Sequence, residues 1–180
     1  MLYWFLAGLL LLVITALLLY WLLIITEGVY LGRRLVVWLY DLTASRYDRI
    51  KAFDPASESF FVTRPLLARM ATNPPPIVLD VATGTGRLPY FLLEEATFNG
   101  RVIGLDPSAS MLAYAASKLR HYRHRASLVQ QTAADLPFND NTFAAVACLE
   151  SLEFFPDDSA ALREMFRVLQ PGGTLLTARR

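Results

Sequence analysis

The sequence has a single cysteine and almost no net charge. Cys148 is its one thiol among 180 residues, which excludes an intrachain disulfide framework and a cysteine-rich zinc site. The 17 basic and 16 acidic side chains nearly cancel, so the positive excess of a dedicated nucleic-acid binder is missing. Because 54% of the residues are hydrophobic, intrinsic disorder and collagen-like repeats are excluded as well.

Charge is absent altogether from residues 1–26, which are almost entirely hydrophobic. A helix over this stretch would rise about 37 Å, enough to cross a hydrocarbon core of about 30 Å. The stretch has no preceding basic residue, short apolar region or small-x-small site, so it does not resemble a cleaved signal peptide. A chain this small has no core that could surround such a helix. We therefore predict a transmembrane anchor over residues 1–26.

The distribution of basic residues around this span predicts its orientation. None precedes it and several follow it, so the positive-inside rule predicts a single-pass membrane protein with the remainder in the cytoplasm. Residues 27–42 mix arginines with a bulky apolar run, which is typical of an amphipathic juxtamembrane segment lying along lipid headgroups. Packing against the core is the alternative. The basic side chains that follow the span, and on which the orientation rests, are Arg33, Arg34, Arg46, Arg49 and Lys51.

A proline-rich connector at residues 73–76 separates two regions of different periodicity. Residues 43–76 are predicted to form a helical lid and linker, broken near Asp54 and Pro55. Beyond them, short apolar runs alternate with helix-compatible stretches, which predicts an α/β, Rossmann-like domain with a mostly parallel sheet over residues 77–180. The expected strands are 77–81, 101–105, 127–130, 143–148 and 173–178, and the expected helices are 87–96, 108–120 and 159–169.

Three acidic side chains lie at the ends of successive expected strands. Asp80 opens a glycine turn that ends at Gly86, Asp106 ends the second strand, and Asp135 follows the third. Ligands of open α/β sheets bind at this edge, where an acidic residue can accept hydrogen bonds from ribose hydroxyls. The dinucleotide fingerprint would need a third glycine where Pro89 stands, which disfavours a nucleotide-dependent oxidoreductase.

Four motifs in this order, at residues 78–87, 102–112, 134–143 and 162–175, resemble the class I S-adenosylmethionine-dependent methyltransferases. The resemblance is strongest to the ubiquinone/menaquinone biosynthesis C-methyltransferases, and the Tyr47-Asp48 pair is similar to the segment that precedes their domain. It implies S-adenosyl-L-methionine as cofactor. The implied cofactor-binding residues are Asp80, Ala82, Thr83, Gly84, Thr85 and Gly86 for the methionine portion, Asp106 and Pro107 for the ribose, Met111, Ala134, Asp135 and Leu136 for the adenine, and Leu149 near the methyl group.

The same resemblance places Tyr47 and Glu150 at the substrate, while no catalytic residue or metal ligand is assigned. His121 and His124 lie among arginines and are expected to form a solvated basic patch. We predict a membrane-anchored methyltransferase that acts on a small lipophilic acceptor, either a quinone precursor or a lipid. In the family the sheet continues past the fifth strand. The alternative is therefore a non-catalytic or truncated cofactor-binding membrane module that needs a partner or a further C-terminal segment.

Overall fold

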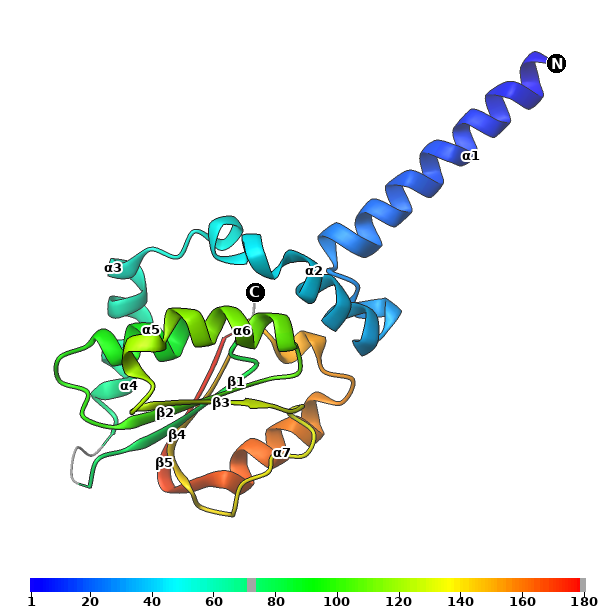
Figure 1. Ribbon diagram of the computed structural model, residues 1–180. Helices are drawn as coiled ribbons and strands as arrows, with labels where there is room; N and C mark the ends of the chain where they lie inside the picture. Colours follow the sequence, from blue (N-terminus) through cyan, green and yellow to red (C-terminus); the bar gives the residue numbers. More distant parts are fainter. Residues whose placement is uncertain (71–73, 179–180) are drawn as a thin grey trace.

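The computed structural model describes residues 1–70 and 74–178 and shows a layered α/β domain from which one long helix projects (Figure 1). Asn73 of the expected proline-rich connector lies outside the described residues, as do Arg179 and Arg180. The projecting helix α1, Leu2–Tyr20, continues through the π-helical turn η1, Trp21–Ile25. An 18-residue window within Leu2–Ile25 has a mean hydropathy of 2.8 and none of it is buried, so the helix is long and apolar enough to cross a membrane.

Two glycines mark the turn between α1 and the next long helix. Gly28 and Gly32 have φ values of 76° and 94°, backbone conformations that L side chains rarely adopt, and the short 3-10 helix η2, Val29–Leu31, lies between them. Helix α2, Arg33–Lys51, then runs without interruption. The division expected between residues 42 and 43 thus falls inside one helix, since no residue between Arg33 and Lys51 interrupts the backbone hydrogen bonding.

The break expected near Asp54 and Pro55 is present. Ala52 ends α2 in the left-handed conformation, and Asp54 caps the following helix by accepting a 2.8 Å hydrogen bond from the Ser57 amide. Three short pieces follow and lead to the sheet. They are α3, Pro55–Glu58, the π-helical η3, Ser59–Thr63, and α4, Arg64–Leu67.

Five parallel strands form one sheet in the order β3-β2-β1-β4-β5, which confirms the predicted fold class. The three inner strands are largely buried because helices cover both faces of the sheet, whereas the two edge strands are partly exposed. The strands are β1, Ile77–Val81; β2, Arg101–Asp106; β3, Ala126–Gln130; β4, Phe143–Leu149; and β5, Leu169–Ala178. The helices between them are α5, Arg87–Glu94; α6, Ala109–Lys118; the 3-10 helices η4, Arg120–Tyr122, and η5, Leu152–Phe154; and α7, Asp158–Val168.

The core consists of one hydrophobic cluster on each face of the sheet. On one face, Leu88 and Leu92 of α5 pack on Val78 and Val102. On the other face, Met165 of α7 packs among the strand side chains that point to that side of the sheet. Figure 1 shows α5 and α6 on one side of the strands and α7 on the other. Strand β5 begins at residue 169, earlier than expected, because Leu169 already pairs with Phe143 at a register shift. The sheet therefore holds the carboxyl ends of its strands at one rigid edge.

Candidate active site

Three adjoining cavities that share lining residues lie along the carboxyl ends of β1, β2 and β4, the edge at which ligands of open α/β sheets bind, and together we call them the cleft. Ala82 lines all three cavities. Tyr47 and Glu150 mark one end, and Ala134 and Pro156 mark the other. The cleft therefore crosses the point where the strand order reverses between β1 and its two neighbours.

The turn after β1 presents backbone rather than side chains to the cleft. Ala82, Gly84 and Gly86 all have positive φ, at 58°, 54° and 77°. A Cβ on Gly84 would meet only open space and the ring of Tyr47, whereas one on Gly86 would lie 3.1 Å from the Cβ of Ala115. Gly84 thus keeps the cleft open, and Gly86 lets α5 pack closely on α6.

Asp80 is a buried carboxylate at the base of this turn. Its side chain is 3% exposed and accepts a 2.6 Å hydrogen bond from the Thr83 hydroxyl. Burial raises the pKa of Asp80 to about 7, and the nearby Asp106 adds to the rise, although the Thr83 hydrogen bond and the charge of Arg87 oppose it. A cation in the cleft would therefore stabilise the ionised carboxylate.

Asp106 ends β2 and is held by two backbone amides. Its carboxylate accepts hydrogen bonds from Gly84 at 2.8 Å and from Ser108 at 2.9 Å. Burial raises the pKa of Asp106, while these two hydrogen bonds oppose the rise. Each carboxylate oxygen retains a lone pair after accepting one amide, so the group can still accept from a diol. Asp106 and Ser108 both line the cleft.

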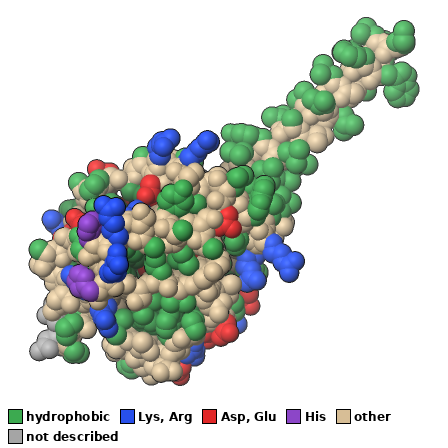
Figure 2. All heavy atoms as spheres, viewed as in Figure 1, with side chains coloured by type: hydrophobic (Ala, Val, Ile, Leu, Met, Phe, Trp, Pro, Cys, Tyr) green, Lys and Arg blue, Asp and Glu red, His purple; other side chains and the backbone are tan. Residues whose placement is uncertain are grey.

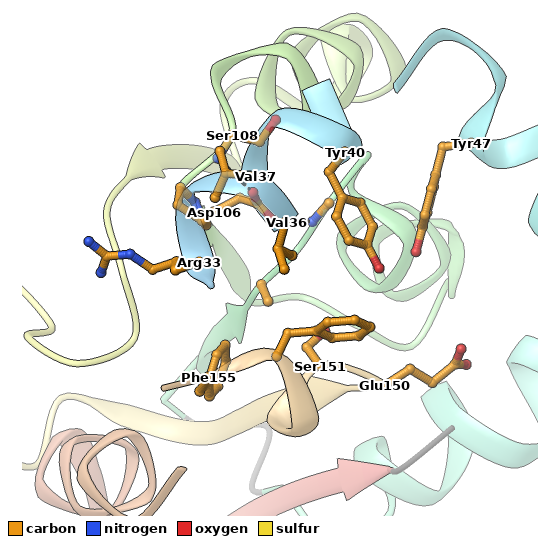
Figure 3. A pocket seen from close by; sticks show the side chains of 14 residues that line it. Arg33, Val36, Val37, Tyr40, Tyr47, Asp106, Ser108, Glu150, Ser151 and Phe155 are labelled. Atoms are coloured by element: carbon orange, nitrogen blue, oxygen red, sulfur yellow. Dashed lines mark hydrogen bonds between the residues drawn. The ribbon is translucent and has the colours of Figure 1, made fainter. Parts of the chain in front are cut away.

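Helix α2 roofs the cleft. Figure 3 shows its side chains above the cavity, with Tyr40 and Tyr47 pointing down toward it and Phe155 on the opposite wall. Burial and the charge of Glu150 raise the pKa of Tyr47 to about 12, so its hydroxyl stays protonated at neutral pH. The walls near the roof are largely apolar. They include Val36, Val37, Tyr40, Phe154 and Phe155.

Two acids of α2 fasten this roof to the domain. Asp41 accepts hydrogen bonds from the Ser108 hydroxyl at 2.5 Å and from the Ser110 amide at 3.2 Å, at the start of α6. Asp48 accepts a 2.5 Å hydrogen bond from the Thr85 hydroxyl and forms a 2.7 Å ion pair with Lys118. The roof is thus bound both to the glycine turn and to α6.

Arg87, the first residue of α5, joins the lid to the end of β4. Its guanidinium donates to both oxygens of the buried Glu58 and, at 2.8 Å, to Glu150. Lys51 reaches the other oxygen of Glu150 at 3.3 Å, and the guanidinium lies over the ring of Phe53. Although burial opposes it, the hydrogen bond and charge of Arg87, with the charge of Lys51, lower the pKa of Glu150. Glu150 is therefore ionised at neutral pH.

The structure brings most of the sequence-predicted site residues to this cleft, while others lie apart from it. Asp135 is exposed and lines none of the cavities, although its neighbour Ala134 does. Met111 is buried in α6, and the amide of Leu136 donates to Glu164 at 2.9 Å. Thr85 and Gly86 belong to the glycine turn but do not line the cleft, and the roles of all the predicted site residues stay predictions. The predicted residues that line the cleft are Asp80, Ala82, Thr83, Gly84, Asp106, Pro107, Ala134, Leu149, Glu150 and Tyr47.

Several residues of the site were not predicted from the sequence. Arg87 stands at the end of the glycine motif, but its partners Glu58 and Glu150 are 29 and 63 residues away in the chain. The roof residues Val36 and Tyr40 were also missed; they share one face of α2 with the predicted Tyr47, and this helical spacing was the available signal. Among the described residues, no group of three or more histidine, cysteine or acidic side chains is arranged to hold a metal ion.

The fold and cleft define a Rossmann-like α/β domain built to bind a ligand at the carboxyl edge of its sheet. The sequence pattern of the methyltransferase domain family matches residues 78–173, and the chain belongs to that family. Over 140 residues it is 36% identical to the demethylmenaquinone methyltransferase of Lactiplantibacillus plantarum, covering 77% of this chain and 59% of that protein. Over 99 residues it is 41% identical to the demethylmenaquinone methyltransferase of Listeria welshimeri, covering 54% and 42%.

Among solved structures, the crystal structure of the [4+2]-cyclase SpnF superposes with a TM-score of 0.67 and 25% identity, covering 81% of this chain and 59% of that one. The chain thus spans about half the length of the relatives that it matches. Since one of these neighbours is named a cyclase and two are named methyltransferases, the fold alone does not determine the reaction.

Proposed function

We propose that this chain is a membrane-anchored, S-adenosylmethionine-dependent methyltransferase that acts on a small lipophilic acceptor. One observation carries the proposal: a single cleft joins the buried carboxylates of Asp80 and Asp106 to an apolar roof contributed by α2. Its family membership and the names of its relatives support the same reaction class. A quinone precursor is the first acceptor to test, and a lipid is the second.

The residues of the cleft fit S-adenosylmethionine by their chemistry. Asp80, whose pKa is about 7 in a buried site, suits the cationic methionine end of the cofactor. Asp106 offers free lone pairs to ribose hydroxyls, and Gly84 leaves space for close approach to the backbone. The end lined by Leu105, Ala133 and Pro156 is apolar enough to accept an adenine ring.

The cofactor supplies a methyl group that its sulfonium already activates. The protein must therefore bind, align and exclude water, and the roof over the cleft suits that role. Glu150 stands at the Tyr47 end of the cleft, ionised between Arg87 and Lys51. This position suits it to orient an acceptor, while Tyr47 remains a hydrogen-bond donor.

Anchoring through α1 explains a lipophilic acceptor physically. The uncovered apolar helix is long enough to span a bilayer, and the basic residues that follow it favour a cytoplasmic domain. Tethering at the bilayer raises the effective concentration of the cleft near molecules dissolved there. Alkaline extraction of membranes should leave the protein in the pellet, and protease added outside sealed cells should spare the domain.

Titration of the full chain in lipid nanodiscs with S-adenosylmethionine tests cofactor binding. We expect saturable heat of binding, and D106A should weaken the affinity at least tenfold because ribose hydrogen bonds are lost. D158A, which removes an exposed acid of α7, is the matched control and should bind normally. An absence of saturable binding by the unaltered protein would overturn the proposed function.

Methyl transfer is tested separately, with cofactor labelled in the methyl group. The label should pass to demethylmenaquinone or to a lipid added to the nanodiscs. Binding of the cofactor without transfer to quinone, lipid or membrane extract would instead support the alternative, a binding module without turnover.

A further inference from the structure

The face of α2 that points away from the cleft carries a stripe of bulky apolar and basic side chains. Arg34, Trp38, Leu42, Arg46 and Ile50 recur at every fourth position and are all exposed, so they form a stripe that winds by about 40° per step around the outer side of the helix. Trp38 is 56% exposed, and Leu42 and Ile50 are each 66% exposed. Arg49 is also exposed and shares this face. We call these six residues the outer stripe.

Charge is segregated around α2. Its two acids, Asp41 and Asp48, face the domain, where they bond to Ser108 and to Lys118. The arginines of the outer stripe take no part in any ion pair found within residues 1–70 and 74–178. The outer stripe therefore presents positive charge and apolar surface together, without a compensating acid.

The outer stripe lies close to the proposed membrane span. The turn between Gly28 and Gly32 ends the span and redirects the chain, and Figure 1 shows α2 running across the base of α1 rather than continuing it. Figure 2 shows hydrophobic side chains along α1 as far as its junction with the domain. A helix that crosses the direction of a spanning helix at its cytoplasmic end lies near the plane of the headgroups.

We infer that the outer stripe of α2 docks on the anionic headgroup surface of the bilayer, an inference that rests on the proposed anchoring by α1. Arginines pair with lipid phosphates, and tryptophan with leucine and isoleucine enters the interface. An anionic bilayer is the occupant that the residues favour, because a protein partner offers no continuity with α1.

Docking of the outer stripe would place the acceptor site close to the bilayer. The opposite face of α2 carries Val36, Tyr40 and Tyr47, which roof the cleft. When the outer stripe lies on lipid, the cleft sits about one helix diameter, roughly 10 Å, below the membrane surface. One helix thus forms both the membrane contact and the wall of the acceptor site, so that a lipophilic acceptor travels only that distance from the bilayer.

The fluorescence of Trp38 tests the contact directly. The chain has three tryptophans, so W4F/W21F leaves Trp38 as the one reporter in the full-length protein. The protein is placed in nanodiscs of phosphatidylcholine, with or without phosphatidylglycerol, that contain lipid carrying a quencher near the headgroup. We expect strong quenching in the anionic discs, at least threefold less quenching after R34Q/R46Q/R49Q, and a marked loss of quenching in high salt.

The matched control is R101Q/R120Q/R123Q, which removes the same charge from exposed positions at the start of β2, in η4 and directly after η4. It should leave the quenching unchanged. The inference would be overturned if aqueous acrylamide quenched Trp38 equally in anionic and neutral discs. It would also be overturned if lipid quenching were lost only in the control variant, because the arginines near η4 would then be the lipid surface. Cofactor titration of the same discs reports separately on the proposed function, and co-elution with the discs reports on the anchor.

Discussion

Arg87 pairs through two nitrogens with both oxygens of Glu58, at 2.9 and 2.6 Å, and so ties the lid to the first turn of α5. Glu58 is 5% exposed, and a carboxylate at that depth is stable only when a cation and hydrogen bonds compensate the lost hydration. The arginine also lies over Phe53, with 4.3 Å between the guanidinium carbon and the ring centre. The lid and the site are therefore one structural unit.

Removing the Arg87 side chain should destabilise the lid. R87A leaves Glu58 buried without its partner, and we expect a loss of about 3 kcal/mol in the free energy of unfolding, measured by circular dichroism in detergent. Because Lys cannot supply two parallel donors, R87K should recover only part of the loss. The control is R64A. Arg64 lies in the same lid but is exposed and 3.9 Å from Glu95, so its loss should cost less than about 1 kcal/mol. Equal costs for the two alanine variants would contradict the argument.

Ala82 carries backbone strain in the glycine turn. Its φ of 58° is costly for a residue with a Cβ, by about 1–2 kcal/mol. Part of the relief in A82G is offset by the greater freedom of glycine in the unfolded chain, so we expect a net gain of up to about 1 kcal/mol. G84A is the reverse experiment at φ 54° in the same turn and should lower the melting temperature. If A82G also lowered it, the strain assigned to Ala82 would be wrong.

How much of this could be predicted from sequence differs between the sheet and the lid. The strands and their acids were predictable, because apolar runs alternate with helices and each acid lies at or near the carboxyl end of its strand. Helix α2 was divided at residue 42, since the run of apolar residues stops there while the inward spacing from Val36 to Tyr47 continues. One face of residues 31–40 packs on the domain, as the core-packing alternative expects, and the headgroup alternative stays a prediction.

The partnership of Arg87 could not be predicted. It depends on two acids far apart in the chain, one of which, Glu150, has a φ of 54° that no local motif signals. Tertiary packing alone brings these side chains together.

Asp48 should control how long the cofactor stays bound. It bonds to Thr85 at 2.5 Å and to Lys118 at 2.7 Å, and so holds α2 over the glycine turn. D48A should accelerate dissociation of S-adenosylmethionine about tenfold, which corresponds to about 1.4 kcal/mol, as measured by stopped-flow displacement. D140A removes an acid from an exposed ion pair with Arg167, on the other side of the domain, and should leave the dissociation rate unchanged. An unaltered rate in D48A would show that α2 does not gate release.

The raised pKa of Asp80 makes the stability of the free protein depend on pH. With a folded pKa of about 7 against an ordinary 3.8, the folded state holds this proton more tightly than the unfolded chain does. Stability from Asp80 is therefore complete below about pH 4 and is lost as pH rises through 7, on the order of 4 kcal/mol. D80N should remove this slope from chemical denaturation measured between pH 4 and pH 8. A slope that is unchanged in D80N would contradict the assignment.

Cofactor affinity should change with pH in the opposite direction. The cationic end of S-adenosylmethionine favours the ionised form of Asp80, and with a pKa of about 7 that form is scarce at pH 5 and half populated at pH 7. The affinity should therefore rise more than tenfold between pH 5 and pH 7, with release of a proton that calorimetry in buffers of different ionisation enthalpy detects. D80N should bind weakly at both pH values and release none. Proton uptake on binding by the unaltered protein would rule out Asp80 as the group that meets the cation.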